Sequence, residues 1–309
     1  MKIRPVLATL IFGALLLQLF ADDAATSPVA AEHADIVGRV RAKIKSGPVT
    51  AQSLAPEITA INALLAKHPE RTEDIAQLAL LKAELYLQVI GDEETGKKLF
   101  TAVTSDFAGT KAAAIAQQVL QVMTPEAKAK AAEHQAKIDR LVGHAAPELH
   151  FKWSSKDGLK TLSSLKGNVV VLDFWATWCG PCIASFPQLR EHVAHFKGAP
   201  VVFLGVTSIQ GFVANLEPGK IETKGNPARE ISLMPAFMKA KNMTWDIAIS
   251  DEDVFNPAYS IPGIPTVVII APDGTVRHPG LSPLDPRADI AGKISALLKE
   301  FNLPVPTVN

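Results

Sequence analysis

The chain has 309 residues, of which 48% are hydrophobic, and it carries 31 basic and 31 acidic side chains. This length suggests about two domains. The balanced charge gives no electrostatic basis for binding nucleic acid or an anionic membrane surface, so we expect neither as a partner.

The first 21 residues have the layout of a secretory signal peptide. Lys2 and Arg4 form a short basic leader, residues 6–20 are uncharged and mostly apolar, and Ala21 precedes the acidic Asp22. This apolar run is shorter than the roughly 20 residues that a helix needs to cross a bilayer. We therefore expect residues 1–21 to be a cleaved signal peptide and the protein to be exported, periplasmic or otherwise extracytoplasmic. An uncleaved membrane anchor is the alternative.

The part of the chain from residue 28 to residue 142 is rich in alanine, leucine, lysine and glutamate and contains no tryptophan. Apolar residues recur at helical spacing over residues 58–65, with His68-Pro69 as the stop. The same spacing returns over residues 75–85, with Gly91-Asp92 as a turn. The pattern predicts an all-α domain of helical hairpins.

Two further features mark this helical domain. Leu78 to Phe100 loosely resembles a single tetratricopeptide hairpin, although the segment from Tyr86 to Gly91 is one residue longer than the usual pattern. Thr124-Pro125-Glu126 is typical of a helix start, and we expect a charged helix from there to Leu141. The apolar stripe of the hairpin is expected to be core, and a partner-binding surface is the alternative.

Gly143 to Pro147 ends the helical pattern, and we place the domain boundary between residues 142 and 143. The apolar, β-branched run at residues 169–172 is typical of a buried central strand. Residues 143–309 are therefore expected to form an α/β domain. Further strands are predicted at residues 200–206, 245–249 and 266–270 and from Thr275, and helices at residues 183–196, 228–241 and 285–301.

Cys179 and Cys182 are the only two cysteines of the chain. A disulfide across so short a ring constrains the unfolded chain by only about 2 kcal/mol, so a stabilising cross-link does not explain the pair. A structural zinc site would need four ligands, and no second ligand cluster is present. The pair is therefore predicted to be redox-active, with no metal and no bound cofactor.

The cysteines lie in a longer motif that resembles thioredoxin. The motif comprises Asp173–Cys182, with Pro187 downstream and Tyr259–Thr266 later in the chain. The chain also resembles the exported TlpA-like thiol-disulfide oxidoreductases, through Gly143, Ala146-Pro147, Asp157-Gly158 and residues 162–167 upstream of the motif and through the extra segment between Thr207 and Trp245. This resemblance covers Gly143 to Leu303 and implies a thioredoxin fold, with a central mixed sheet flanked by helices, after the helical-hairpin domain.

The resemblance assigns three catalytic residues. Cys179 would lie just before a helix, whose free N–H groups and positive dipole end favour a thiolate, so it is the expected nucleophile. Cys182, shielded one turn inside the helix, would resolve the mixed disulfide. Asp173 would be a buried carboxyl of raised pKa that takes the proton of Cys182. The assignment requires the Cys179 sulfur to be open to solvent.

Two departures from the resembled proteins affect this site. Thioredoxin pairs the buried acid with a lysine from the next central strand, whereas Val201–Thr207 contains no lysine. Ser185 stands where several relatives that act in cytochrome c maturation have a glutamate. The identity of the client is therefore left open.

The resemblance also implies a docking surface for an extended substrate strand. Pro265 is expected to be cis and to turn the Ile264 backbone toward the cysteines, and Trp178 is expected to be exposed beside Cys179. Phe174 and Trp175 are expected to be core. The expected substrate-binding residues are Trp178, Gly180, Pro181, Gly263, Ile264, Pro265 and Gly280.

The resulting prediction is an exported disulfide reductase whose partners are disulfide-bonded client proteins and a membrane electron-donor protein, with a role in cytochrome c maturation as one form of it. A thiol peroxidase is an alternative, although peroxidases of this fold place a threonine before the reactive cysteine. A non-catalytic protein that binds partners through its helical domain is the other alternative.

Overall fold

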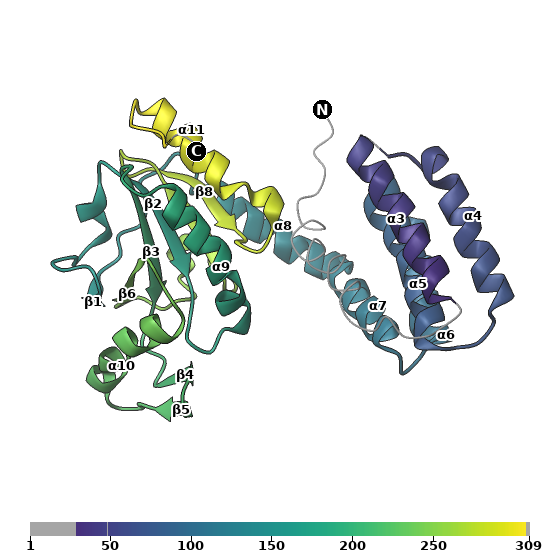
Figure 1. The fold of residues 1–309 in the computed structure, drawn as a ribbon, viewed down its shortest axis with the longest axis horizontal. Coiled ribbons are helices and arrows are strands. Elements are labelled where there is room, and N and C mark those ends of the chain that lie inside the picture. Colours follow the sequence, from purple (N-terminus) through teal and green to yellow (C-terminus); the bar gives the residue numbers. More distant parts are fainter. Residues whose placement is uncertain (1–28, 48, 307–309) are drawn as a thin grey trace. The chain divides into compact units, whose positions relative to one another are not determined.

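A computed structural model describes residues 29–47 and 49–306, so the predicted signal peptide lies outside the described residues. The chain divides into two compact units, one ending at Ala132 and the other starting at Glu133 (Figure 1). This division falls within the helix α8 (Pro125–Asp139), earlier than the boundary predicted between residues 142 and 143. Within the described ranges, no helix is both long enough and apolar enough to cross a membrane.

The first unit is entirely helical, as predicted. Consecutive helices pack against one another around two apolar clusters, one shared by α3, α4 and α5 and the other by α5, α6 and α7. The helices are α3 (Ala30–Ser46), α4 (Ala51–Lys67), α5 (Glu73–Glu84), η1 (Leu85–Ile90), α6 (Glu93–Asp106), α7 (Lys111–Val122) and α8 (Pro125–Asp139), which continues into the second unit.

The extra residue of the tetratricopeptide-like hairpin has a structural explanation. The segment Leu85–Ile90 is a π-helix, whose i→i+5 hydrogen bonds accommodate one more residue per turn than an α-helix. The segment ends at Gly91, which has a φ of 79°, and Asp92 then caps α6 by accepting the Thr95 N–H at 3.0 Å. The predicted turn is therefore confirmed, and the longer segment is absorbed by a local change in helix winding.

The second unit contains a six-stranded mixed sheet with the strand order β1-β6-β3-β2-β7-β8. β2 is parallel to β3 and antiparallel to β7, and the edge strands β1 and β8 are antiparallel to their neighbours. The strands are β1 (Phe151–Ser154), β2 (Val169–Phe174), β3 (Val201–Thr207), β4 (Phe212–Leu216), β5 (Gly219–Glu222), β6 (Asp246–Ser250), β7 (Thr266–Ile270) and β8 (Val276–Leu281). The helices and short helical turns are η2 (Leu162–Leu165), α9 (Gly180–His195), α10 (Pro227–Ala240), η3 (Pro257–Tyr259), η4 (Pro286–Ala288) and α11 (Ile290–Glu300).

Every residue of β2 is buried, as expected for a central strand. Side chains alternate between the two faces of a strand. Val169 and Val171 belong to the core cluster that contains both cysteines and the apolar sides of α9, α10 and α11. Val170, Leu172 and Phe174 belong to the cluster on the opposite face. The alternation therefore puts the side chain of Asp173 on the face that carries the cysteines.

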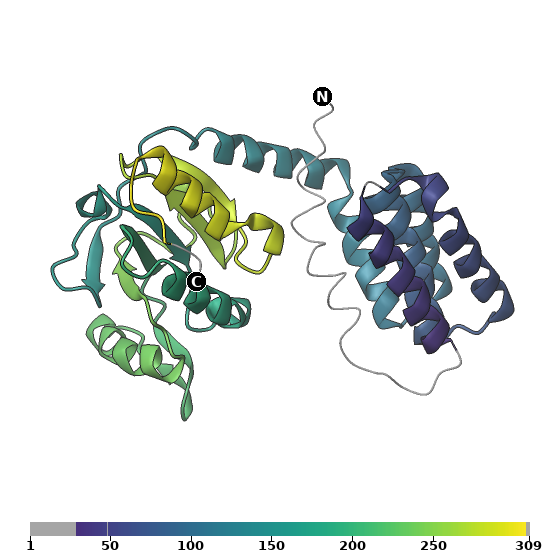
Figure 2. The ribbon, with the colours of Figure 1, turned by 45° about the horizontal axis from the view of Figure 1, so that its top comes forward.

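The predicted strands and helices of the second unit are present, and the edge strand β1 is an additional strand that was not predicted. Two further details differ. The last helix begins at Ile290 rather than at residue 285, because Asp289 takes a φ of 44° and caps the helix by accepting the Gly292 N–H at 3.1 Å. The extra segment contains a β4–β5 hairpin that was not predicted. Figure 2 shows this hairpin and α10, in green, side by side.

The close approach of Gly205 to Trp175 gives a first prediction. A Cβ at Gly205 would lie 2.8 Å from Trp175 Nε1 and 3.1 Å from a methyl group of Ile247. The Trp175 ring is fully buried and held by Phe186 and Phe237, so it has little room to move. Gly205→Ala should lower the free energy of unfolding by about 1–3 kcal/mol in a urea titration.

Gly38→Ala is the matched control, because a Cβ at this position in α3 would meet no atom within 4 Å. It should leave the stability unchanged or raise it by up to about 1 kcal/mol. Equal stability of Gly205→Ala and the unmodified protein would contradict this account of the core.

Candidate active site

The two cysteines lie where the buried strand β2 gives way to α9. Cys179 is the N-cap residue of α9, and its Sγ accepts a hydrogen bond from the Cys182 N–H at 3.1 Å. Pro181 occupies the first turn, where its missing N–H costs no helical hydrogen bond. Cys179 and Cys182 form a disulfide with their Cα atoms 5.3 Å apart. The predicted placement at the start of a helix is therefore found.

The exposure of Cys179 differs from the expectation. Cys179 keeps 3% of its surface accessible and Cys182 keeps none, so Cys182 is the more shielded residue, as predicted. An openly accessible sulfur at Cys179 was also predicted, and this is wrong for the disulfide-bonded state. The reason is that the Cys179 Sγ is bonded to Cys182 on one side and lies 3.7 Å from the Ile264 carbonyl oxygen on another. Attack on another disulfide belongs to the dithiol state, in which the bond to Cys182 is broken, so the requirement of an open sulfur applies to that state.

The Ile264–Pro265 peptide bond is cis, as expected. The carbonyl oxygen of Ile264 is the backbone atom that lies 3.7 Å from Cys179 Sγ. In the disulfide this sulfur has no hydrogen to give, whereas a Cys179 thiol at the same place could donate to that oxygen. The loop before β7 and the start of α9 therefore meet at the sulfur, although they are far apart in the sequence.

Asp173 is buried, with 2% of its surface accessible, and neither of its carboxylate oxygens has a hydrogen-bond partner among the described residues. Burial raises the pKa of Asp173 from 3.8 to about 7, because the charged form loses its hydration. In β3, Gly205 is its register partner, so no lysine is supplied from there. The carboxyl group can therefore exchange a proton near neutral pH on the cysteine-bearing face of the sheet.

Ser185 lies on the first turns of α9 and is buried. Its hydroxyl donates a hydrogen bond to the Cys182 carbonyl oxygen at 2.7 Å. A glutamate at this position would bring a charge into a site that is 1% accessible. The serine that stands here in place of the relatives' glutamate therefore has its hydroxyl satisfied by a hydrogen bond within α9.

The remaining predicted substrate-binding residues differ in how exposed they are. Trp178, Gly180 and Pro181 are exposed next to the disulfide, whereas Gly263 is half-buried and its carbonyl oxygen accepts the Thr266 hydroxyl at 2.7 Å. Gly280 has a φ of 71° and is half-buried, and a Cβ there would lie 3.0 Å from Ile138 Cδ1. Ile264 and Pro265 are also half-buried, so the fully exposed residues of the predicted surface are those around the start of α9.

Three residues beside the site were not singled out in the sequence. Gln210 Oε1 accepts the Trp178 Nε1–H at 2.9 Å, the ring of Phe255 lies 6.3 Å from the ring of Trp178, and the buried Glu230 accepts hydrogen bonds from the loop that carries Gln210. All three lie at or beyond the end of β3, outside the cysteine motif. No spacing rule connects them to it, so only the folded chain brings them together.

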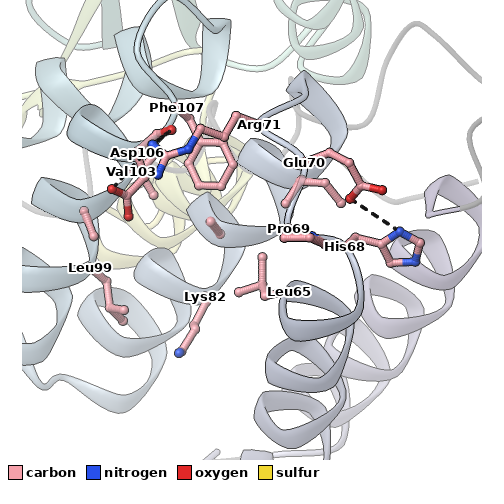
Figure 3. A pocket seen from close by; sticks show the side chains of 13 residues that line it. Leu65, His68, Pro69, Glu70, Arg71, Lys82, Leu99, Val103, Asp106 and Phe107 are labelled. Atoms are coloured by element: carbon pink, nitrogen blue, oxygen red, sulfur yellow. Dashed lines mark hydrogen bonds and ion pairs between the residues drawn. The ribbon is translucent and has the colours of Figure 1, made fainter.

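The helical unit has a separate cavity of about 290 Å³ (Figure 3). Its charged rim is partly paired, with Arg71 donating to the Asp106 carbonyl oxygen at 2.5 Å and His68 lying 3.7 Å from Glu70. Over the described ranges, no group of three or more histidine, cysteine, aspartate or glutamate side chains is placed to hold a metal ion. The cavity is lined by Leu65, His68, Pro69, Glu70, Arg71, Ile75, Ala79, Lys82, Leu99, Ala102, Val103, Asp106 and Phe107.

Comparison with known proteins gives the following matches. Residues 141–294 match the Redoxin family. The chain is 30% identical over 115 residues to the thiol-disulfide oxidoreductase ResA of Bacillus subtilis, a match that covers 37% of this chain and 54% of ResA. It is 28% identical over 140 residues to ResA of Oceanobacillus iheyensis, covering 44% and 63% of the two chains. The crystal structure of a thiol-disulfide isomerase from Corynebacterium glutamicum aligns with a TM-score of 0.38 and 17% identity, over 50% of this chain and 96% of that one.

The matched stretch thus spans between about half and two thirds of the length of the two ResA proteins. The stretch that matches the Redoxin family, residues 141–294, contains both cysteines, Asp173 and the cis-proline loop. The second unit of this chain is therefore similar to Redoxin domains and to the ResA thiol-disulfide oxidoreductases.

Proposed function

We propose that the protein is an exported thiol-disulfide oxidoreductase that reduces disulfide bonds of client proteins through Cys179 and Cys182. The observation that carries the proposal is the position of Cys179 Sγ at the first turn of α9, where it accepts the Cys182 N–H at 3.1 Å. An N–H donor and the positive end of a helix dipole stabilise a thiolate, and the thiolate is the form that attacks a disulfide.

The reaction would proceed in two exchanges. The Cys179 thiolate attacks one sulfur of the client disulfide, and the other client sulfur leaves as a thiolate and takes up a proton. Cys182 then loses its proton to Asp173 and attacks Cys179 Sγ, which releases the second client thiol. Two electrons have moved to the client, and the protein is left as the disulfide present in this structure.

Asp173 suits the second exchange because its pKa of about 7 lets it accept a proton near neutral pH. Because Cys182 has no accessible surface, solvent water is poorly placed to take the proton itself. The Asp173 carboxylate lies on the same face of the sheet and takes the Cys182 proton in place of water.

We further propose that the protein works outside the cytoplasm and is returned to the dithiol form by a membrane protein. The basic and apolar character of residues 1–21 supports export. An exported dithiol is separated from the cytosolic reductants, so a donor must pass electrons across the membrane. Apocytochrome c is one client class that the TlpA-like resemblance supports.

The direction of electron flow is tested by the reduction potential of the cysteine pair. For a reductase we expect a value near the roughly −270 mV of thioredoxin and far from the roughly −120 mV of the oxidant DsbA. Equilibration of the full chain with a dithiol–disulfide redox buffer would give the value. A potential near that of DsbA would reverse the proposed direction.

The order of the two exchanges predicts the behaviour of Cys182→Ser. This variant keeps the nucleophile and lacks the resolving thiol, so it should accumulate mixed disulfides with disulfide-bonded proteins. Non-reducing electrophoresis followed by mass spectrometry would detect them. Cys179→Ser is the matched control and should trap few or none, since its remaining sulfur is buried; equal trapping by the two variants would contradict the assignment of the nucleophile.

The role of Asp173 predicts a pH-dependent defect in Asp173→Asn. In the unmodified protein the second exchange should accelerate as the pH rises through about 7, because Asp173 then becomes ionised. The variant lacks this base, so its rate should be at least roughly tenfold lower near pH 7.5. The gap should narrow at alkaline pH, where hydroxide can take the thiol proton without the help of a carboxylate.

Single-turnover release of client thiol at a series of pH values would measure both rates. Asp157→Asn, an exposed carboxylate of the same unit, serves as the control and should follow the unmodified profile. Parallel pH profiles for Asp173→Asn and the unmodified protein would remove Asp173 from the mechanism.

A further inference from the structure

Two aromatic rings stand exposed beside the disulfide. Trp178, next to Cys179 in the chain, is 38% accessible, and Phe255 is 41% accessible. Their ring centroids lie 6.3 Å apart with the planes inclined by 34°. Large apolar side chains that are exposed together, rather than singly, mark a surface that another molecule covers.

The Trp178 ring is held in place by a hydrogen bond rather than by burial. Its Nε1–H donates to Gln210 Oε1 at 2.9 Å. The amide nitrogen of Gln210 donates in turn to the carbonyl and hydroxyl oxygens of Ser208, at 3.0 and 2.9 Å. The side-chain amide therefore has both ends engaged and cannot rotate away without breaking three contacts.

The same serine also reaches the segment that carries Phe255. Ser208 Oγ accepts the backbone N–H of Val254 at 3.1 Å, one residue before Phe255. The two rings are thus attached to a single hydrogen-bonded loop at the end of β3. Their relative position is set by that loop and does not depend on contact between the rings alone.

Glu230 of α10 holds this loop in place through hydrogen bonds. It is 3% accessible, and its two carboxylate oxygens accept the backbone N–H groups of Gln210 and Gly211 and the hydroxyl of Thr223, at 2.7, 2.8 and 2.7 Å. A buried carboxylate is tolerated only when hydrogen bonds replace its hydration, and charge-assisted bonds of this kind are strong. The loop that holds Trp178 is therefore rigidly placed.

We propose that Trp178 and Phe255 form a two-ring surface that selects client disulfides flanked by an apolar side chain, with Gln210 as the residue that positions Trp178. This inference rests on the proposed reductase function and names its client preference. The occupant is a polypeptide segment whose apolar residue, next to the cysteine under attack, covers both rings. Continuity with the disulfide favours this occupant, because Trp178 adjoins the nucleophile and a bound cysteine brings its neighbours over the rings.

The test uses the pre-reduced full chain in single turnovers with three disulfides. Two are peptides of equal length and charge that differ only in having leucine or serine beside the cysteine, and the third is hydroxyethyl disulfide. Second-order rate constants come from the release of client thiol. Each turnover consumes the Cys179–Cys182 dithiol and leaves the protein disulfide, so no further reductant is needed.

The unmodified protein should react faster with the leucine peptide than with the serine peptide. Phe255→Ala should slow the leucine peptide by about tenfold, the usual loss when an aromatic anchor of an interface is truncated, and change the other two substrates by less than twofold. Val142→Ala, which shortens another exposed apolar residue, is the matched control and should leave all three rates unchanged.

The role of Gln210 is separated from a general structural role by a pair of variants. Gln210→Leu removes the oxygen that accepts the Trp178 Nε1–H, so it should slow the leucine peptide and increase quenching of tryptophan fluorescence by acrylamide. Gln210→Glu keeps an oxygen that can accept the Trp178 Nε1–H but loses both donations to Ser208, so it should recover part of each value. Equal values for the two variants would overturn the positioning role.

The outcomes also distinguish this inference from the function on which it rests. If the unmodified protein reduces all three disulfides but Phe255→Ala slows both peptides equally, or neither, the two-ring surface is refuted and the reductase stands. If the unmodified protein reduces none of the three, the proposed function fails and the inference fails with it.

Discussion

The site is organised by one hydrogen bond, from the Cys182 N–H to Cys179 Sγ at 3.1 Å. This bond requires α9 to begin immediately at Gly180, with Pro181 in its first turn, so that the Cys182 N–H at the helix start points at the sulfur. It also requires Cys179 to stay outside the helix as its cap. Cys179, Cys182 and the start of α9 are therefore a single local arrangement.

The strand that leads into this arrangement, β2, carries the buried carboxyl group of Asp173. β2 is buried along its full length because it is flanked on both sides in the sheet and covered on both faces. A carboxyl group at Asp173 therefore loses its hydration, which raises its pKa to about 7. The burial that makes β2 a stable central strand is the same feature that makes Asp173 able to exchange protons at neutral pH.

The extra segment after β3 contributes to the site through tertiary hydrogen bonds. Asn215 Nδ2 donates to the Thr177 carbonyl oxygen at 2.8 Å, and the Ala214 N–H donates to the Thr177 hydroxyl at 3.1 Å. Together with the hydrogen bond from Trp178 to Gln210, these bonds connect Thr177 and Trp178 to the extra segment. The extra segment thus helps to position Thr177 and Trp178, the two residues before Cys179.

The sequence by itself determined the fold class, the main strands and helices, and the cysteine pair at a helix start, because periodicity, capping residues and the Cys-Gly-Pro-Cys spacing are local signals. Only the tertiary structure decided how little of Cys179 is open, since its cover comes from Ile264, which is distant in sequence. The same holds for the β4–β5 hairpin and for the network of Gln210, Ser208 and Glu230. These features depend on contacts between segments that are distant in the sequence. Neither segment carries a local pattern that indicates its partner.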